Sequence, residues 1–332
     1  MANLALRSPQ FKTIVAGVGV QSSVLELRIN GVLKYTLIKN KTISSSITQA
    51  FDISELARDY IDIIYENNYI PISQPVGCLI RNYDGLNGTG SQVGANVSYS
   101  DIGLEGYGNF EEEVNPDIPF RNTPTYMIPR DNLGPSIINT FTILAPIGEP
   151  GKIPSISASN LIYATSYSAS DTSVTNNDGV VCNIKRIDCT KYTPKKIVYI
   201  NKYGAQQDLW FFLKNSKNLA RTNEGFKSNT MVYETSGPEY SVQNATNKII
   251  NTQAKQTHTL NSGFYPEFAN QFFEELLLSE YVWLDTLKKG VGVTIPVKVK
   301  NASVAFKTTL NDKLIDYTIV FEEAFDYINN IR

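Results

Sequence analysis

Residues 196–215, KIVYINKYGAQQDLWFFLKN, constrain the fold more than any other part of the chain, because they contain two short runs that are apolar throughout. Successive side chains of a β-strand point to opposite faces, so IVYI at 197–200 and LWFFL at 209–213 are each apolar on both faces. A strand with one face in water alternates apolar and polar residues instead. The segment therefore predicts a hairpin around Gly204 with both of its faces covered.

Aromatic and β-branched residues predict a mainly β fold. The chain of 332 residues contains 19 tyrosines and 15 phenylalanines, and turn-forming residues recur between short apolar runs. A chain of this length usually forms more than one core, so we predict two β-sandwich or barrel-like domains, each with one packed amphipathic helix. The proline-rich segment APIGEPGKIP at 145–154 is the expected junction between an N-terminal domain at 1–145 and a C-terminal domain at 146–332.

Two segments depart from the β pattern and predict one helix in each domain. The first lies near residues 52–66, where Asp52 and Glu55 resemble a capping box and the apolar residues follow helical spacing. The second lies near residues 266–279, where Pro266 suits a first helical turn and a stripe of Phe and Leu lies opposite Glu and Gln. We expect each helix to pack against a sheet.

Three further segments carry structural expectations. Residues 82–98 and 165–179 are rich in Gly, Ser, Asn and Thr, so we expect exposed loops there. Residues 304–321 alternate apolar and polar side chains on either side of a turn at Asn311. This pattern predicts a long C-terminal hairpin with one buried face.

Charge and cysteine content argue against several kinds of partner. Lys and Arg number 30 and Asp and Glu 32, the formal net charge is −2, and the basic residues are scattered, so we expect no specific nucleic-acid contact. Cys78, Cys182 and Cys189 are odd in number and lack metal-ligand spacing, which argues against a disulfide framework or a zinc site. No apolar run is long enough for a signal peptide or a membrane span, and we expect the chain to be made in the cytoplasm.

The chain has a single histidine, His258, and this limits nucleophilic mechanisms. A Ser–His or Cys–His pair would have to use it, no G-x-S-x-G motif is present, and its polar surroundings predict a surface or loop position. Segments 171–182 and 85–94 lack residues that a calcium loop or a phosphate-binding loop requires. We therefore expect no catalytic residue, no metal and no cofactor.

Two alternatives remain open at this point. The acidic run that contains Glu111, Glu112, Glu113 and Asp117 could supply the carboxylate pair of a glycosidase, although such a run more often marks a solvated strand end. The many tyrosines also permit carbohydrate stacking on a β-sandwich surface. A receptor- or glycan-binding β-sandwich module is therefore the alternative function, and a hydrolase is a third.

Five segments in order resemble those of virion structural proteins of large tailed bacteriophages, of the crAss-like and marine phage types. These segments are SPQFKTI, FDISELARDYID, EGYGNFEEEVNP, CTKYTPKKIVYINKYGAQQDLWFF and LNDKLIDYTIVFEEAFDYINNIR, and together they span nearly the whole chain. The resemblance implies a protein without enzymatic activity in the neck, tail or baseplate of a virion, assembled in the host bacterial cytoplasm. It also implies a ring-like homo-oligomer that contacts other virion proteins.

Ring assembly would give the two-sided hairpin a second covering surface, because head-to-tail contacts that close produce cyclic rings. We expect one set of its side chains in the domain core, namely Ile197, Tyr199, Leu209 and Phe211. The others face a helix or a neighbouring subunit, and the candidate interface residues are Tyr203, Trp210 and Phe212.

Overall fold

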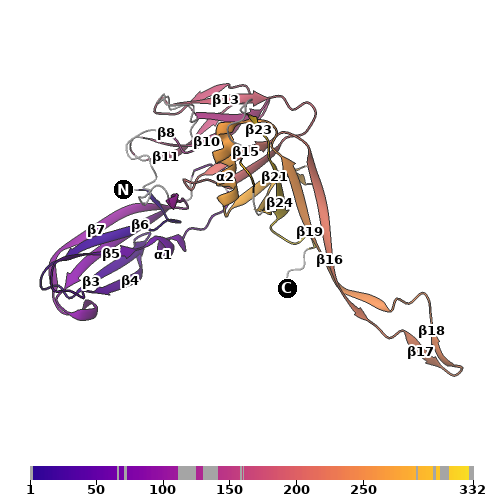
Figure 1. Cartoon of the computed structure of the whole chain (residues 1–332), viewed down its shortest axis with the longest axis horizontal. Coiled ribbons are helices and arrows are strands. Elements are labelled where there is room, and N and C mark those ends of the chain that lie inside the picture. The colour runs from indigo at the N-terminus through magenta and orange to yellow at the C-terminus, as the bar shows by residue number, and fades with distance from the viewer. Residues whose placement is uncertain are drawn as a thin grey trace.

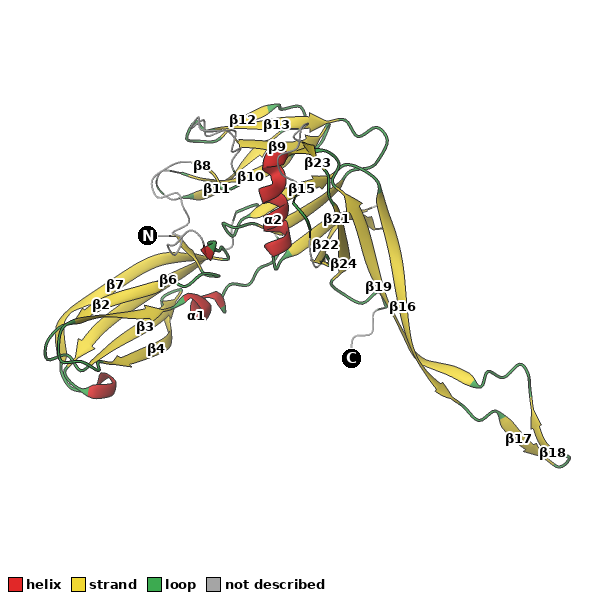
Figure 2. Cartoon of the chain, viewed as in Figure 1, coloured by secondary structure: helices red, strands yellow, loops and turns green. Residues whose placement is uncertain are grey.

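The fold is mainly β, as the sequence predicts. The computed structural model describes residues 3–65, 67–70, 73–110, 125–129, 141–157, 159, 161–288, 291–301, 304–306 and 314–328. Strands dominate these residues, and the α-helices among them are α1 (Ser54–Arg58) and α2 (Asn270–Leu278). Figure 2 shows how little of the chain is helical. Short 3₁₀ turns occur at Leu86–Gly88 and Glu267–Ala269.

The N-terminal part is built from two sheets around one core. The larger sheet has the order β1 (Asn3–Ala5), β7 (Gln92–Leu104), β6 (Ser73–Tyr83), β3 (Ser22–Ile29) and β4 (Val32–Asn40), with β1 parallel to β7 and the other pairs antiparallel. The smaller sheet pairs β2 (Phe11–Ala16) with β5 (Ile47–Asp52). Leu25, Leu27, Phe51 and Ile80 are buried in the core that the two sheets share.

The first helix is much shorter than predicted. α1 ends at Arg58, whereas the sequence pattern predicted a helix near residues 52–66. The capping box does not form, because the Asp52 carboxylate accepts hydrogen bonds from the backbone N–H and the hydroxyl of Ser54. Beyond the helix, Ile61 and Ile63 are buried and the residues between and after them are exposed, which is the period of an extended chain.

The C-terminal part contains two small three-stranded sheets and one large sheet. One small sheet has the order β11 (Ile162–Tyr167), β10 (Gly151–Ile156), β8 (Thr125–Tyr126), and the other β12 (Ser173–Thr175), β13 (Val181–Ile187), β9 (Phe141–Pro146). The large sheet has the order β15 (Gln206–Phe211), β14 (Lys195–Ile200), β21 (Val282–Lys288), β22 (Val291–Val299), β24 (Thr318–Glu323), β19 (Asn247–Asn261), β16 (Asn215–Lys227). Two short pairs remain, β17 (Met231–Glu234) with β18 (Gly237–Tyr240) and β20 (Tyr265–Pro266) with β23 (Leu314–Ile315).

The two-sided hairpin forms as predicted, and the chain itself covers both of its faces. Strands β14 and β15 pair in antiparallel register, with Ile197 opposite Leu209. Ile197 and Tyr199 are buried in the C-terminal core, while Val198 and Ile200 are buried in the N-terminal core. The hairpin therefore lies between the two cores and contributes side chains to both.

The second helix forms where the sequence predicts it and packs on the hairpin. Phe273 of α2 is fully buried, and its ring meets Phe211, Tyr265 and Tyr317 with centroids 6.3, 5.3 and 5.0 Å apart. These contacts are edge-to-face, the arrangement that aromatic quadrupoles favour. Figure 1 shows α2 crossing the strands of the large sheet.

Arg58 forms one ion pair within the N-terminal part and a second that reaches the C-terminal part. The Arg58 guanidinium at the end of α1 donates to both oxygens of the buried Glu105 carboxylate, with Nε at 2.9 and 3.0 Å. Its Nη2 lies 2.6 Å from the carboxylate of Glu280, which follows α2. The junction predicted at Ala145–Pro146 falls within β9, a strand that pairs in parallel with β13.

The predicted loops are partly strands. Residues 92–98 belong to β7, so the turn between β6 and β7 spans only residues 84–91. The segment 165–179 contains the end of β11 and all of β12. The first arm of the predicted C-terminal hairpin lies partly outside the described residues. In the second arm Ile315, Tyr317, Ile319 and Phe321 are buried, and β24 pairs with β22 and β19.

Candidate functional site: a projecting β-hairpin arm

A long hairpin leaves the body of the protein and forms an arm (Figure 1). β16 and β19 pair along their length, but β24 accompanies β19 only from Thr257 to Asn261. We call residues 222–253 the arm, which begins at the pair Thr222–Gln253, and residues 229–246 its tip. β16 has 13 residues, which at about 3.4 Å per residue gives a strand about 44 Å long.

The sequence of the arm explains why it stands away from the body. β16 reads NSKNLARTNEGFK and is exposed from its second residue to its last, because neither face carries a continuous apolar row. The register shifts between Glu224 and Gly225, and such a bulge increases the local twist of a ribbon. With no apolar face to bury, the strands gain nothing from folding back on the body.

The tip nevertheless carries exposed apolar side chains. Tyr233 is 75% exposed, Tyr240 74% and Val242 92%. Met231 and Val232 of β17 are also exposed. A two-stranded ribbon is at best marginally stable alone in water, so the exposed aromatic residues at its end make the tip the candidate binding surface of the chain.

The sequence did not single out this arm. Residues 215–257 lack the apolar alternation by which strands are recognised. Their strand signals are short clusters such as MVY at 231–233 and KIINT at 248–252, with turn residues at 235–237. Strand pairing in the arm depends on hydrogen bonds between polar partners. Composition does not reveal such pairing.

The candidate interface residues lie elsewhere and are buried by the chain itself. Trp210 is 7% exposed and Phe212 5%, and both belong to the C-terminal core. Tyr203 is 8% exposed and packs with Ala5 and Leu104 of the N-terminal sheet. These three side chains are not brought together on one surface, and little of their area remains for another molecule to cover.

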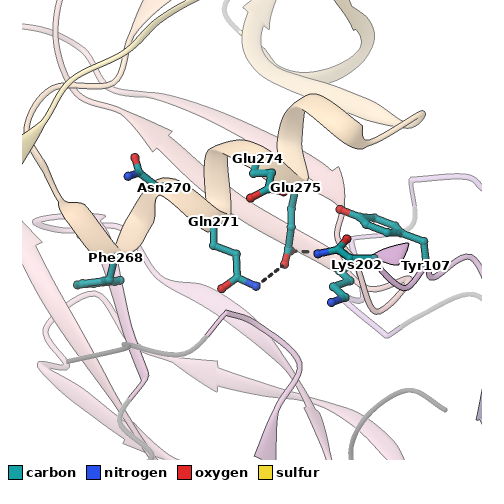
Figure 3. Close-up of a pocket in the computed structure, with 8 residues that line it drawn as sticks. Tyr107, Lys202, Phe268, Asn270, Gln271, Glu274 and Glu275 are labelled. Carbon is teal, nitrogen blue, oxygen red and sulfur yellow. Dashed lines mark hydrogen bonds between the residues drawn. The ribbon is translucent and has the colours of Figure 1, made fainter. Parts of the chain in front are cut away.

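A second feature is a cavity of about 310 Å³ beside α2 (Figure 3). It is lined by Tyr107, Asn109, Lys202 and residues of α2, including Gln271 and Glu275. The Glu275 carboxylate accepts a hydrogen bond from the Lys202 backbone N–H at 3.4 Å and faces the Gln271 amide at 3.5 Å. Burial raises the pKa of Glu275 to about 8, and the nearby Lys202 opposes part of that rise.

The single histidine is a structural residue on β19. His258 was expected at the surface or in a loop, but it is buried, with Nε2 3.1 Å from the carboxylate of the equally buried Glu323. Burial lowers the pKa of His258, and the hydrogen bond to Glu323 opposes that change. The sequence pattern misplaced this residue because its polar neighbours point outward from a strand that has one buried face.

Metal ligands and acidic residues add little to the search for a site. Within the residues that the structure describes, no group of three or more His, Cys, Asp or Glu side chains could hold a metal ion. Cys78 and Cys182 are buried, Cys189 is partly buried, and none of the three forms a disulfide. The acidic run at 111–117 lies outside the described residues.

No helix in the described ranges is both long enough and apolar enough to span a membrane.

Comparison with known proteins identifies no family for this chain. No protein-family model, no curated protein and no solved structure matches this chain.

Proposed function

We propose that this chain is a structural subunit of a tailed-phage virion, in the neck, tail or baseplate. It forms a ring-like assembly with copies of itself, contacts other virion proteins, and carries out no catalysis. The observation that carries this proposal is the arm, whose exposed apolar tip lies far from the body along the longest axis of the molecule (Figure 1). The segments that resemble phage virion proteins agree with it.

An arm of this kind suits assembly better than ligand binding. Its strands present backbone groups and side chains over a long, narrow surface, which matches a protein partner and offers no enclosed volume for a small molecule. Ordering a flexible ribbon costs conformational entropy, and a large contact area offsets that cost when a partner covers it. The arm would then extend the reach of each subunit without enlarging its body.

The body supplies a rigid base for the arm. β16 and β19 continue from the large sheet, where β19 pairs with β24 and the Phe321 side chain is fully buried. The arm is therefore anchored at its root by the core strand β24.

The proposal is tested by the mass of the protein in solution. We expect light scattering on a sizing column to find a closed species of several subunits at high protein concentration. A variant in which Asn-Gly replaces residues 222–253 should fold with an unchanged core, because the removed residues are mostly exposed, and should lose the large species. A strict monomer at every concentration contradicts ring formation by the chain alone.

A receptor- or glycan-binding module at a tail tip is the second proposal, favoured by the exposed rings of Tyr233 and Tyr240. Aromatic faces bind sugars by stacking. Both tryptophans, Trp210 and Trp283, are buried and could not contribute. A glycan array probed with the full chain tests this function, with Tyr233→Ala as the matched variant, and binding that the substitution leaves unchanged would reject the tip as its site.

A further inference from the structure

The tip of the arm is acidic as well as apolar. Residues 229–246 contain Glu234 and Glu239 and no basic residue. Neither carboxylate forms an ion pair within the described chain, and Glu239 accepts only a hydrogen bond from Ser236. The two charges lie on the same short ribbon as the exposed side chains of Val232 and Tyr233.

The edge strand β4 has the complementary character. It ends the order of the N-terminal sheet, so one of its edges has no neighbouring strand in the described part of the chain. Val32, Leu33 and Ile38 are exposed on it. Residues 30–46 contain three lysines and no acidic residue.

The three lysines of residues 30–46 have no carboxylate partner in the described part of the chain. Lys39 and Lys41 donate to the backbone carbonyls of Ala50 and Gly17, which carry no net charge, and Lys34 lies over the ring of Tyr60 at 5.0 Å. None of the three ammonium groups makes an ion pair with a carboxylate in the described residues. On the neighbouring strand, Glu26 is already paired with Arg28 and Arg81.

The two surfaces cannot meet within one molecule. β4 and the β17–β18 ribbon lie at opposite ends of the longest axis (Figure 1). A contact between them must join two copies, and it is head-to-tail because each copy contributes a different surface. Repetition of the contact closes a ring when the rotation between copies divides a full turn.

A proline determines which of the two strands at the tip can add to the edge of another sheet. Pro238 lies in β18 and has no backbone N–H, so β18 offers an incomplete edge. β17 contains no proline and carries Met231, Val232 and Tyr233. β17 is therefore the strand suited to pair with a second sheet.

We propose that the tip of the arm docks on β4 of a second copy of this chain, where β17 adds to the free edge of the N-terminal sheet. Backbone hydrogen bonds would supply affinity, as in other cases of strand addition, and the apolar side chains would cover one another. Glu234 and Glu239 against the lysines of residues 30–46 would set the orientation of the contact. This inference rests on the proposed function, since it requires self-assembly.

Zero-length carbodiimide cross-linking tests the contact directly, because it joins a carboxylate to an amine only where they touch. We would mix isotopically heavy and light full-length chains, cross-link the assembled species, and identify linked peptides by mass spectrometry. The expected products join Glu234 or Glu239 of one chain to Lys34, Lys39 or Lys41 of the other in heavy–light pairs.

Variants with reversed charges on the tip and on β4 provide a second test with a matched control. The tip variant Glu234→Lys with Glu239→Lys and the edge variant Lys34→Glu with Lys39→Glu should each assemble at least tenfold more weakly than the parent. The two variants mixed together should recover assembly, because each restores the other's complement. A double variant of similar charge change elsewhere, Glu55→Lys with Glu149→Lys, should assemble like the parent, since both side chains are exposed and neither belongs to the tip or to residues 30–46.

The outcomes separate this inference from the proposed function. A closed oligomer whose cross-links lie elsewhere, or whose charge variants fail to complement one another, overturns the docking of the tip on β4 and leaves the ring in place. A strict monomer at every concentration overturns both. Cross-links at the expected residues together with recovery in the mixture support both.

Discussion

The protein contains two hairpins that differ in almost every physical respect. The β14–β15 hairpin is buried on both faces and separates two cores, whereas the β16–β19 hairpin leaves the body and is exposed along most of its length. The first has apolar side chains on both faces, and the second has polar side chains on both faces. The comparison teaches that the same backbone motif serves as a core element or as a reaching arm according to what its side chains can bury.

The largest difference between the hairpins is expected in hydrogen exchange. Amides of β14 and β15 should exchange only through global unfolding, which typically requires about 5–15 kcal/mol, whereas amides of residues 222–253 should exchange through local opening that costs far less. Exchange followed by mass spectrometry measures both regions in one sample. Equal protection in the monomer would contradict an independent arm, and protection that appears in the arm only on assembly would sharpen the comparison.

A matched pair of phenylalanine substitutions compares the two regions energetically. Phe273→Ala should destabilise the protein by about 3–5 kcal/mol, because it opens a cavity among the rings of Phe211, Tyr265 and Tyr317. Phe226→Ala in the arm should change the free energy of unfolding by less than about 0.5 kcal/mol, since Phe226 is exposed. Chemical denaturation measures both changes, and similar costs would show that the arm shares the body's cooperativity.

The buried carboxyl of Glu275 makes the stability of the body depend on pH. Its pKa is about 8 in the folded protein and near 4.5 when exposed, so the folded state binds more protons between these values and stability falls as the pH rises from about 4.5 to 8. Glu275→Gln removes this loss and should be more stable than the parent by a margin that grows to a few kcal/mol at pH 8 and above. Denaturation at pH 5, 7 and 9 measures the margin.

The neighbouring residue provides the control for this pH effect. Glu274 is exposed on the same helix and its charge adds to the rise in the pKa of Glu275, but burial is the main cause, so Glu274→Gln should keep most of the parent's pH dependence. A margin for Glu275→Gln that stays constant from pH 5 to pH 9 would mean that the carboxyl does not titrate in this window. The arm contributes no comparable buried group among its described residues.

A smaller loss than that of Phe273→Ala is expected at Arg58, which pairs with Glu105 in the N-terminal part and with Glu280 in the C-terminal part. Arg58→Met leaves the buried Glu105 carboxylate without its bidentate partner, and we expect a loss of about 1–3 kcal/mol, less than for a fully buried pair because Arg58 is partly exposed. Arg28→Met, at an exposed pair with Glu26, should cost about 0–1 kcal/mol. Thermal unfolding measures the stability lost in each variant. Equal losses for Arg58→Met and Arg28→Met would show that the ion pairs of Arg58 contribute no more than an exposed pair.

How much the sequence predicts depends on whether the side chains face a core. The two-sided hairpin and α2 were predictable because their apolar patterns match the periods of a strand and a helix, and both were found at the expected residues. α1 was predicted too long, because Tyr60, Ile63 and Ile64 continue the helical spacing of the residues before them. The structure instead buries Ile61 and Ile63, which are two residues apart as in an extended chain, and the local pattern could not choose between the two periods.

The sequence by itself determined the mainly β class, the buried hairpin and α2, because these depend on side-chain patterns that any core must satisfy. Only the tertiary structure decided that both faces of β14–β15 are covered within one chain, that His258 is buried against Glu323, and that residues 222–253 form an arm. These features depend on which distant segments meet, and a polar ribbon pairs through backbone groups that every residue carries. Side-chain composition therefore leaves little trace of them.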